Sequence, residues 1–425
     1  MNALMATAAP IALAAAGNLV AAGNLVAGTT APAVAGPGEK PLPWVKASGT
    51  SFVDESGKPL RLRGINFGGW LIIEGWIIEL NRNSPKGEGI HDERELWTVM
   101  RGRFGAKVME RLRRAHRETW ITEDDFRRAR DAGFNFVRVP FWHELIEHDA
   151  RPGVIDASGF AWLDKAVRWA AKYGLWVILD LHGAPGSQNP WDHSGVVGRN
   201  KLFSDGECQS RTARIWKAVA SRYRNDPAVL GYDLLNEPNG GKPEELGALH
   251  DKLYRAVREA DPRHLIIIED GLHGLETMPP PSKYGWENVA YSVHFYLFEA
   301  KDEAPHVKYA AETIPRWRTK QGEFGVPLYI GEFNPIDPVW GLSALARYAG
   351  LFEGERWAWS PWTWKKIEPR RPSLWGVYRN AKPWKRFPDF RRAPAGEIEE
   401  HLRSFTTGRL DPNPDYVKIV REAGR

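Results

Sequence analysis

The sequence predicts an α/β protein of the (β/α)8 TIM-barrel class, with one domain over residues 44–425. Two observations support this fold class. Eight short apolar, β-branched or aromatic runs alternate with helical patterns, which is typical of a parallel sheet whose strands are joined by helices. No G-x-G-x-x-G phosphate loop follows the first run, where the glycines are Gly64, Gly68 and Gly69, so a doubly wound open sheet is the less favoured alternative.

Residues 1–43 differ in composition from the rest of the chain. They are rich in Ala, Gly and Pro, contain AAGNLV twice in tandem, and place an Ala-Val-Ala at 33–35 after an apolar run near 11–16. These features are typical of a signal peptide or a flexible leader, although no Lys or Arg precedes Lys40. We therefore expect a short leader and a secreted or periplasmic location.

The expected elements follow the leader in order. The first is a small hairpin at 45–62, with its turn at 55–58, placed to plug one end of a barrel. The eight expected strands are 62–67, 134–139, 176–181, 229–235, 265–269, 289–293, 327–330 and 357–362. The expected crossover helices are 126–132, 158–173, 211–223, 246–260, 306–321 and 341–352.

Composition limits the possible partners. The net charge of +5 comes from Lys, Arg, Asp and Glu that are interspersed along the chain, which indicates a solvated surface and no nucleic-acid partner. No apolar stretch of 18 residues follows position 40, so we expect no integral membrane segment. Cys208 is the one cysteine and is interpreted as a free thiol. The 20 Trp suit a site whose aromatic rings stack on sugar rings. The sequence does not indicate an oligomeric state.

Polar residues come directly after most of the expected strands. In a barrel the carboxyl ends of all strands meet at one mouth, where catalytic groups are found. Each residue alone could be a helix cap or a satisfied core residue, but their shared position favours an active site. In chain order these residues are Asn66, Arg138, His182, Asn236 with Glu237, His294 with Tyr296, Glu332, and Trp364.

Two glutamates carry the chemistry that we expect of this mouth. Glu237 follows the fourth strand and Glu332 the seventh, so they face each other across the barrel, which allows the roughly 5–5.5 Å separation of a retaining glycosidase. Glu332 is the expected nucleophile, held ionised by Arg138 and hydrogen-bonded by Tyr296. Repulsion between the two carboxylates is expected to raise the pKa of Glu237, the general acid/base.

Two further roles are expected in this mouth. Asn236 is placed to direct its amide at the sugar 2-hydroxyl, where hydrogen bonds strengthen in the transition state. Trp364 is expected to form the stacking floor under the sugar.

Several segments of the chain resemble glycoside hydrolase family 5, and within it the exo-β-1,3-glucanase branch. The resemblance runs from about residue 60 to 365 and is most specific at 180–189, DLHGAPGSQN. It implies the (β/α)8 fold, retention of configuration, and no metal or other cofactor. It also implies that the strand-end residues from Arg138 to Trp364 contact substrate, and that Glu74 contacts the non-reducing sugar. Its other segments are RGINFGGWL (63–71), WITEDDF (120–126), FNFVRVP (134–140), LNEP (235–238), HFY (294–296), GEF (331–333) and TWK (363–365).

The chain departs from the exoglucanases after this segment. Pro-Trp-Asp-His at 190–193 stands where they have Gly-Phe-Asp-Asn, so His193 replaces a sugar-contacting Asn and Trp191 another aromatic, with Asp192 between them. Trp191 and Phe298 are candidates to clamp an acceptor sugar. We expect a β-glucan or β-glucoside as the oligo- or polysaccharide substrate, with exo-β-1,3-glucanase-like action. The alternatives within the family are a β-mannosidase, a β-1,6-glucanase and an endo-β-glucanase.

Two readings from other classes are less favoured. A metal-dependent barrel hydrolase would need clustered ligands such as H-x-H or H-E-x-x-H, and neither motif is present. A carbohydrate-binding barrel without activity would keep the Trp residues but lose one of the two glutamates, and both are present.

Overall fold

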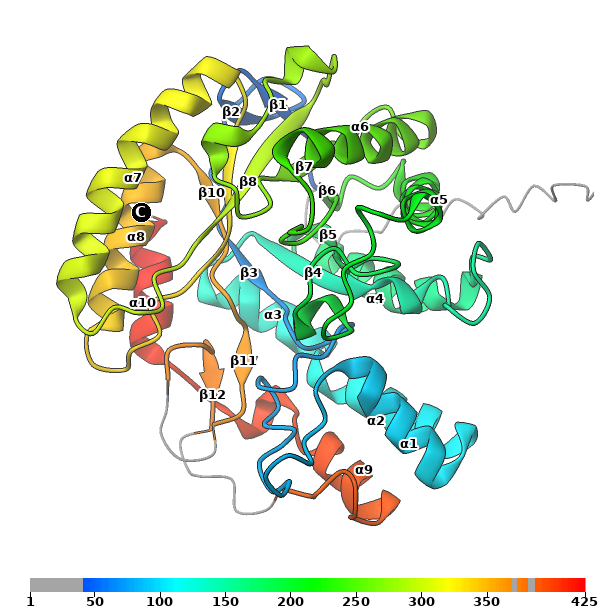
Figure 1. Cartoon of the computed structure of the whole chain (residues 1–425). Coiled ribbons are helices and arrows are strands. Elements are labelled where there is room, and N and C mark those ends of the chain that lie inside the picture. The colour runs from blue at the N-terminus through cyan, green and yellow to red at the C-terminus, as the bar shows by residue number, and fades with distance from the viewer. Residues whose placement is uncertain (1–40, 369–372, 381–386, 425) are drawn as a thin grey trace, which may run out of the picture.

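The computed structural model describes residues 41–368, 373–380 and 387–424. The expected leader at 1–43 lies outside the described residues except for its last three positions. Eight parallel strands form one sheet in sequential order, and a parallel bridge between Arg63 and Trp359 joins its two edges, which confirms the (β/α)8 barrel (Figure 1). The strands are β3 (Gly64–Asn66), β4 (Phe136–Trp142), β5 (Trp176–Gly183), β6 (Val229–Asp233), β7 (Leu265–Glu269), β8 (Val289–Phe295), β9 (Leu328–Phe333) and β10 (Ala358–Trp359).

The six expected helices lie on the outside of the barrel (Figure 1). In α3, the capping box of Thr122 and Asp125 starts the helix, and Gly133, with a φ of 104°, ends it. One face of α4 is buried against the sheet. Trp162 and Trp169, two turns apart on this helix, both pack on Trp70. The six helices are α3 (Glu123–Ala132), α4 (Phe160–Lys172), α5 (Gly206–Tyr223), α6 (Pro243–Ala260), α7 (Glu303–Phe324) and α8 (Gly341–Glu355).

Further elements surround this barrel. The α1–α2 pair lies beside α9, and α10 lies beside α8 (Figure 1). A small sheet consists of β11 (Lys365–Lys366), β12 (Tyr378–Arg379) and β13 (Asp411–Pro412). Among the described residues, no helix combines the length and the apolar character needed to cross a bilayer. The additional helices are α1 (Glu93–Phe104), α2 (Ala106–Trp120), α9 (Ala395–Arg403) and α10 (Pro414–Ala423).

The N-terminal hairpin has its main turn earlier than the sequence predicts. Strand β1 (Val45–Ser48) pairs antiparallel with β2 (Ser51–Asp54) through a tight turn at Gly49, whose φ of 54° favours glycine. The predicted reversal at 55–58 also exists, closed by a hydrogen bond from the Asp54 amide to the Lys58 carbonyl (2.9 Å) and followed by a bridge between Val53 and Pro59. The segment therefore contains two successive turns.

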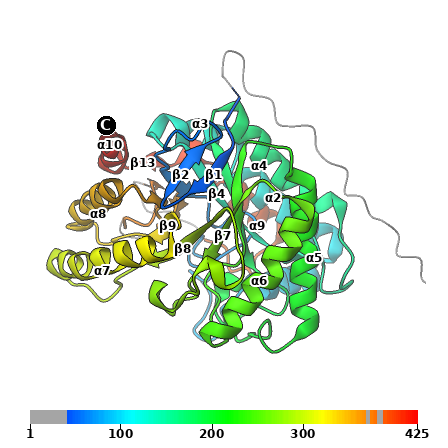
Figure 2. The ribbon, with the colours of Figure 1, turned by 90° about the horizontal axis from the view of Figure 1, so that it is seen from above.

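The hairpin lies against one end of the barrel (Figure 2). Val45 and Phe52 of the hairpin belong to one buried apolar cluster with residues at the amino ends of the barrel strands. Burial of this surface stabilises the fold by the hydrophobic effect and closes that end. The barrel residues in the cluster include Phe136, Trp176, Ile178, Leu230, Leu265, Ile267, Ala290, Tyr329 and Ala358.

Candidate active site

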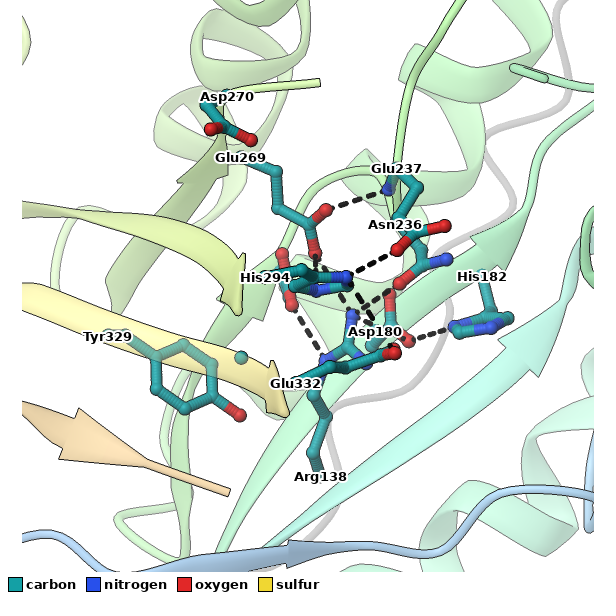
Figure 3. Close-up of polar contacts among 12 residues, drawn as sticks. Arg138, Asp180, His182, Asn236, Glu237, Glu269, Asp270, His294, Tyr329 and Glu332 are labelled. Atoms are coloured by element: carbon teal, nitrogen blue, oxygen red, sulfur yellow. Dashed lines mark hydrogen bonds and ion pairs between the residues drawn. The ribbon is translucent and has the colours of Figure 1, made fainter. Parts of the chain in front are cut away.

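A buried arginine organises the opposite end of the barrel (Figure 3). The side chain of Arg138, on β4, has no exposed surface. Its Nη1 donates to Glu332 Oε1 (2.9 Å) and its Nη2 to Glu269 Oε1 (3.0 Å). Its guanidinium also pairs with Asp233 (2.8 Å) and Asp180 (3.2 Å), which keeps it cationic because four carboxyl groups outweigh the effect of burial and raise its pKa.

Glu332, at the end of β9, is held at both carboxylate oxygens. Arg138 binds Oε1, and the Tyr296 hydroxyl donates to Oε2 at 2.9 Å, as the sequence predicts. Burial raises the pKa of Glu332 even though the charges of His294 and Arg138 lower it, so the expected effect of Arg138 is present but is outweighed in the unliganded site. The carboxyl group is therefore fixed in one orientation by two strong donors.

Glu237 follows β6 in a strained backbone conformation. Its φ of 43° lies in the left-handed region, which a residue with a side chain occupies only when its surroundings hold it there. Its amide donates to Glu269 Oε2 (2.7 Å), which supplies one such restraint. His294 Nδ1 lies 2.6 Å from Glu237 Oε1, and His193 Nε2 lies 3.4 Å from Oε2.

The pKa of Glu237 shifts in the opposite direction from the sequence-based expectation. Burial favours a raised pKa for Glu237, but the hydrogen bond and charge of His294 lower it to about 2, and the pKa of His294 is raised well above its usual value. The expectation of a raised pKa for Glu237 is therefore wrong for the unliganded site. The reason is the short contact with His294, which outweighs the repulsion from Glu332. The His294–Glu237 pair holds one proton between them.

The two glutamates lie next to each other at the mouth. A carboxylate oxygen of Glu237, one of Glu332 and a ring nitrogen of His294 all lie within 4.8 Å of one another. They border a cavity of about 660 Å³. A separation in this range leaves no room for a water molecule between the carboxyl groups and a sugar, and matches the spacing of a nucleophile and an acid/base.

Ten of the twelve predicted site residues line this cavity. Arg138 lies beneath it and reaches it through Glu332 and through Asn236, whose Oδ1 accepts from Arg138 Nη2 at 2.9 Å. This bond turns the amide nitrogen of Asn236 away from the arginine. The ten are Glu74, His182, Trp191, Asp192, His193, Asn236, Glu237, His294, Tyr296 and Glu332.

The twelfth residue, Trp364, does not reach the cavity. Its side chain is fully buried, and its Nε1 donates to Asp125 Oδ1 at 2.8 Å. Trp362 lines the cavity instead and stacks on His182, with ring centres 5.3 Å apart and planes at 10°. The prediction of Trp364 as the stacking floor is therefore corrected to Trp362. Because β10 ends at Trp359, regular strand alternation cannot be used to place these rings.

Glu74 has an oxygen with no partner in the described part of the chain. Its Oε2 accepts from Trp76 Nε1 (2.8 Å), but Oε1 is buried without a hydrogen bond. Burial raises the pKa of this carboxyl well above its usual value. A buried polar atom without a partner is costly, so this oxygen is suited to a ligand hydroxyl in the cavity.

Sequence reasoning missed two groups of residues. The first is the set of carboxyl groups around Arg138, namely Asp180, Asp233 and Glu269. Their signal was present, because each is a charged residue inside an apolar strand run. The second consists of Trp76, Trp375 and Asp270, which line the cavity from loops that carry no periodic pattern.

Two groups of described residues have the spacing of a metal site. Besides Glu237, His294 and Glu332, the group of His143, Glu144 and Asp149 brings three donor atoms within 4.8 Å. In both groups these atoms already have strong partners. Arg94, Arg199 and Arg211 donate to Asp149, and Arg138 and Tyr296 donate to Glu332. Both arrangements are ion-pair networks in which a metal would have to displace cations.

The comparisons with known proteins agree with this geometry. The family model described as Cellulase (glycosyl hydrolase family 5) matches residues 103–366. A probable glucan 1,3-beta-glucosidase A of Aspergillus niger is 35% identical over 310 residues, which are 68% of this chain and 70% of the relative. A beta-xylosidase of Phanerodontia chrysosporium is 28% identical over 359 residues, 77% of this chain and 71% of that protein. The chain spans only 60% of the probable glucan 1,3-beta-glucosidase A of Aspergillus fumigatus, at 33% identity.

Solved structures resemble the fold. Rutinosidase from Aspergillus niger matches with a TM-score of 0.59 at 18% identity, covering 72% of this chain and 90% of that one. Cel5A of Thermotoga maritima in complex with cellobiose matches with a TM-score of 0.54 at 21% identity, covering 80% and 97%. Taken with the family model, which covers more than half of the chain, these findings show that the protein is a glycoside hydrolase that belongs to glycosyl hydrolase family 5.

Proposed function

We propose that this enzyme is a retaining β-glycosidase that removes single glucosyl units from a β-glucan or a β-glucoside. The observation that carries the proposal is the closeness of Glu237 and Glu332, with carboxylate oxygens within 4.8 Å. Inversion needs room for a water molecule between them, at roughly 6.5–9.5 Å, whereas double displacement uses roughly 5–5.5 Å.

The reaction proceeds in two displacements. Glu332 attacks the anomeric carbon, the bond to the leaving oxygen breaks, and that oxygen takes a proton from Glu237. A water molecule then attacks the glycosyl ester, Glu237 takes the proton from that water, and Glu332 leaves as a carboxylate. Arg138 and Tyr296 stabilise Glu332 as it regains its charge, since both donate to its oxygens.

His294 supports Glu237 in both steps. The pair holds one proton, and His294 Nδ1 contacts the Oε1 of Glu237 at 2.6 Å. When the Glu237 carboxyl gives this proton to the leaving oxygen, His294 is left neutral, and its Nδ1–H stabilises the resulting carboxylate by donating a hydrogen bond to it. His294 is itself held by Glu269, 3.4 Å from Nε2.

Support for exo action comes from Glu74 and its neighbours. Oε1 of Glu74, which has no hydrogen-bond partner among the described residues, borders the same cavity as the two catalytic glutamates. So do the rings of Trp76 and Trp375, whose centres lie 4.9 Å apart. A terminal sugar offers free hydroxyls to such a carboxyl and an apolar face to such rings. The names of the glucan 1,3-beta-glucosidase relatives favour β-1,3-linked glucose.

The proposal is tested with a panel of substrates and two variants. Wild-type enzyme is expected to release glucose as the first product from laminarin, in preference to pustulan, cellulose and mannan. E332Q, which keeps the shape of the side chain, is expected to lose about 10⁴-fold or more in kcat on aryl β-glucosides. E237Q is expected to lose far more on a substrate with a poor leaving group than on one with a good leaving group. Preference for mannan, or a mixture of long oligosaccharides as first products, would overturn the proposed specificity.

A further inference from the structure

Glu237 lies between two imidazoles, and the mechanism above uses only one of them. His294 approaches Oε1, while His193 Nε2 lies 3.4 Å from Oε2, the other oxygen of the same carboxyl. His193 lies in the short helical turn Asp192–Ser194, and its side chain is mostly buried. The tautomer of His193 decides whether this contact favours the carboxylate or the carboxylic acid.

Asn189 fixes that tautomer through three hydrogen bonds. Its Oδ1 accepts from the Trp191 amide at 3.1 Å, and its Nδ2 donates to the Glu237 carbonyl at 3.0 Å. These two bonds set the orientation of the amide. In the reversed orientation the amide oxygen would face the Glu237 carbonyl oxygen, and the amide N–H groups would face the N–H of Trp191. The same Nδ2 lies 2.9 Å from His193 Nε2. An amide nitrogen can only donate, so Nε2 of His193 is the acceptor and carries no proton.

The surroundings keep His193 neutral. Burial lowers its pKa, and the rings of His182 and Trp191 lie 5.7 Å and 5.6 Å from its ring. Ser194 holds the turn in place by donating its hydroxyl to the Asn189 and Trp191 carbonyls, at 3.0 and 2.8 Å. The accepting nitrogen is therefore held beside Glu237.

We propose that His193 is a positioning residue that favours the protonated form of Glu237 by presenting an unprotonated Nε2 to its Oε2. The single lone pair of Nε2 accepts from Asn189 Nδ2 and also lies beside Glu237 Oε2; there it repels a carboxylate, whereas the hydroxyl of a carboxylic acid can share it as a second donor. A protonated His193 would instead lower the pKa of Glu237 through its charge. His193 thus draws the proton shared with His294 onto the oxygen that is turned away from His294. This inference rests on the proposed role of Glu237 as general acid.

Other titratable groups act on Glu237 or on His193, and the experiment must separate them from the contact between these two residues. They come from every element that surrounds Glu237. They are Asp180 and His182 on β5, Glu269 at the end of β7 and Asp270 after it, His294 on β8 and Tyr296 after it, Glu332 on β9, and Glu74 and Asp192 outside the barrel strands. A substitution of His193 leaves all of these in place.

The experiment compares H193N with wild type on aryl β-glucosides whose leaving groups differ in acidity. The alkaline limb of kcat/KM reports the loss of the proton held by the acid. In H193N this limb is expected to move to lower pH by about half a unit to one unit, and the loss of kcat/KM to be about 3- to 10-fold greater for phenyl than for 2,4-dinitrophenyl β-glucoside. An unchanged limb with only a raised KM would overturn the proposal, because it would make His193 a substrate-binding residue alone.

Two further measurements keep the test decisive. The ¹⁵N chemical shift of His193 Nε2 in the wild-type enzyme is expected to be that of an unprotonated nitrogen at neutral pH, and a protonated Nε2 would contradict the inference even if H193N folded poorly. E237A serves as the reference for the proposed function. If the loss of kcat/KM in E237A does not depend on the leaving group, the proposed role of Glu237 as general acid fails. If the loss depends on the leaving group in E237A but not in H193N, only the role of His193 is rejected.

Discussion

The two ends of the barrel are formed by the same eight strands, yet they hold opposite kinds of side chain. At the amino ends, Val45 and Phe52 of the hairpin join an apolar cluster that reaches Tyr329. At the carboxyl ends, Arg138 holds four carboxyl groups without exposed surface of its own. The closed end therefore contributes stability through burial, whereas the open end keeps charges in place for chemistry.

The largest expected effect on stability comes from breaking the charged network. R138M leaves the carboxyl groups around Glu332 without their cation, and we expect it to lower the free energy of unfolding by at least about 3–5 kcal/mol in urea denaturation. R127M is the matched control. Arg127 pairs with Asp124 and Asp131 on an exposed helix face, where loss of the pair costs about 0–1 kcal/mol. Equal losses in the two variants would contradict the central role of Arg138.

Shortening a side chain at the closed end is expected to affect stability alone. Phe52 is almost fully buried in the apolar cluster, and F52A should lower the free energy of unfolding by about 3–5 kcal/mol. The kcat and KM of the folded enzyme should stay as in wild type, because Phe52 lies at the opposite end from Glu237. Changed kinetics in F52A below its melting temperature would show that the two ends are not independent.

The open end should also be a source of pH dependence. Burial raises the pKa of Asp270 from 3.8 to about 7, so the folded state binds a proton that the unfolded state has lost. The resulting stability is present below pH 4 and is lost as the pH rises to about 7. D270N carries no such charge. Its free energy of unfolding should match wild type at pH 4 and exceed it by at least about 1.4 kcal/mol at pH 8, and a constant difference between these pH values would refute the assignment.

The smallest effect is expected from the tryptophan that the sequence misplaced. W364F removes the hydrogen bond to Asp125, which should cost about 1 kcal/mol in the free energy of unfolding and leave KM unchanged. W362A removes a ring that borders the cavity, and KM should rise about tenfold. If W364F rather than W362A changed KM, the stacking role would return to Trp364.

The same two ends show what the sequence could predict. Strand β7 was predicted with its observed bounds because an unbroken apolar run marks a buried strand. The sequence predicts a last strand that reaches residue 362, but the regular pairing ends at Trp359. The Trp362 amide still bonds to the Phe333 carbonyl of β9 (3.1 Å), whereas the Thr363 amide bonds to the Trp375 carbonyl in a loop (2.7 Å). That bond joins segments whose pairing no local pattern reveals, and the error at Trp364 followed from it.

The charge state of the site also lay beyond sequence reasoning. The positions of Glu237 and Glu332 followed from strand order alone, because the fourth and seventh strands of a closed barrel face each other. The direction of the pKa of Glu237 depends instead on a 2.6 Å contact with His294. A distance of that kind depends on the packed side chains and is not encoded in spacing along the chain.

The stereochemistry of the first product tests the central claim most directly. Double displacement requires Glu237 and Glu332 to act from opposite sides of one anomeric carbon, at a separation that excludes a water molecule. Proton NMR of an aryl β-glucoside hydrolysis, followed before mutarotation, should show the β-anomer of glucose first. The α-anomer as the first product would contradict double displacement and the role of Glu332 as nucleophile.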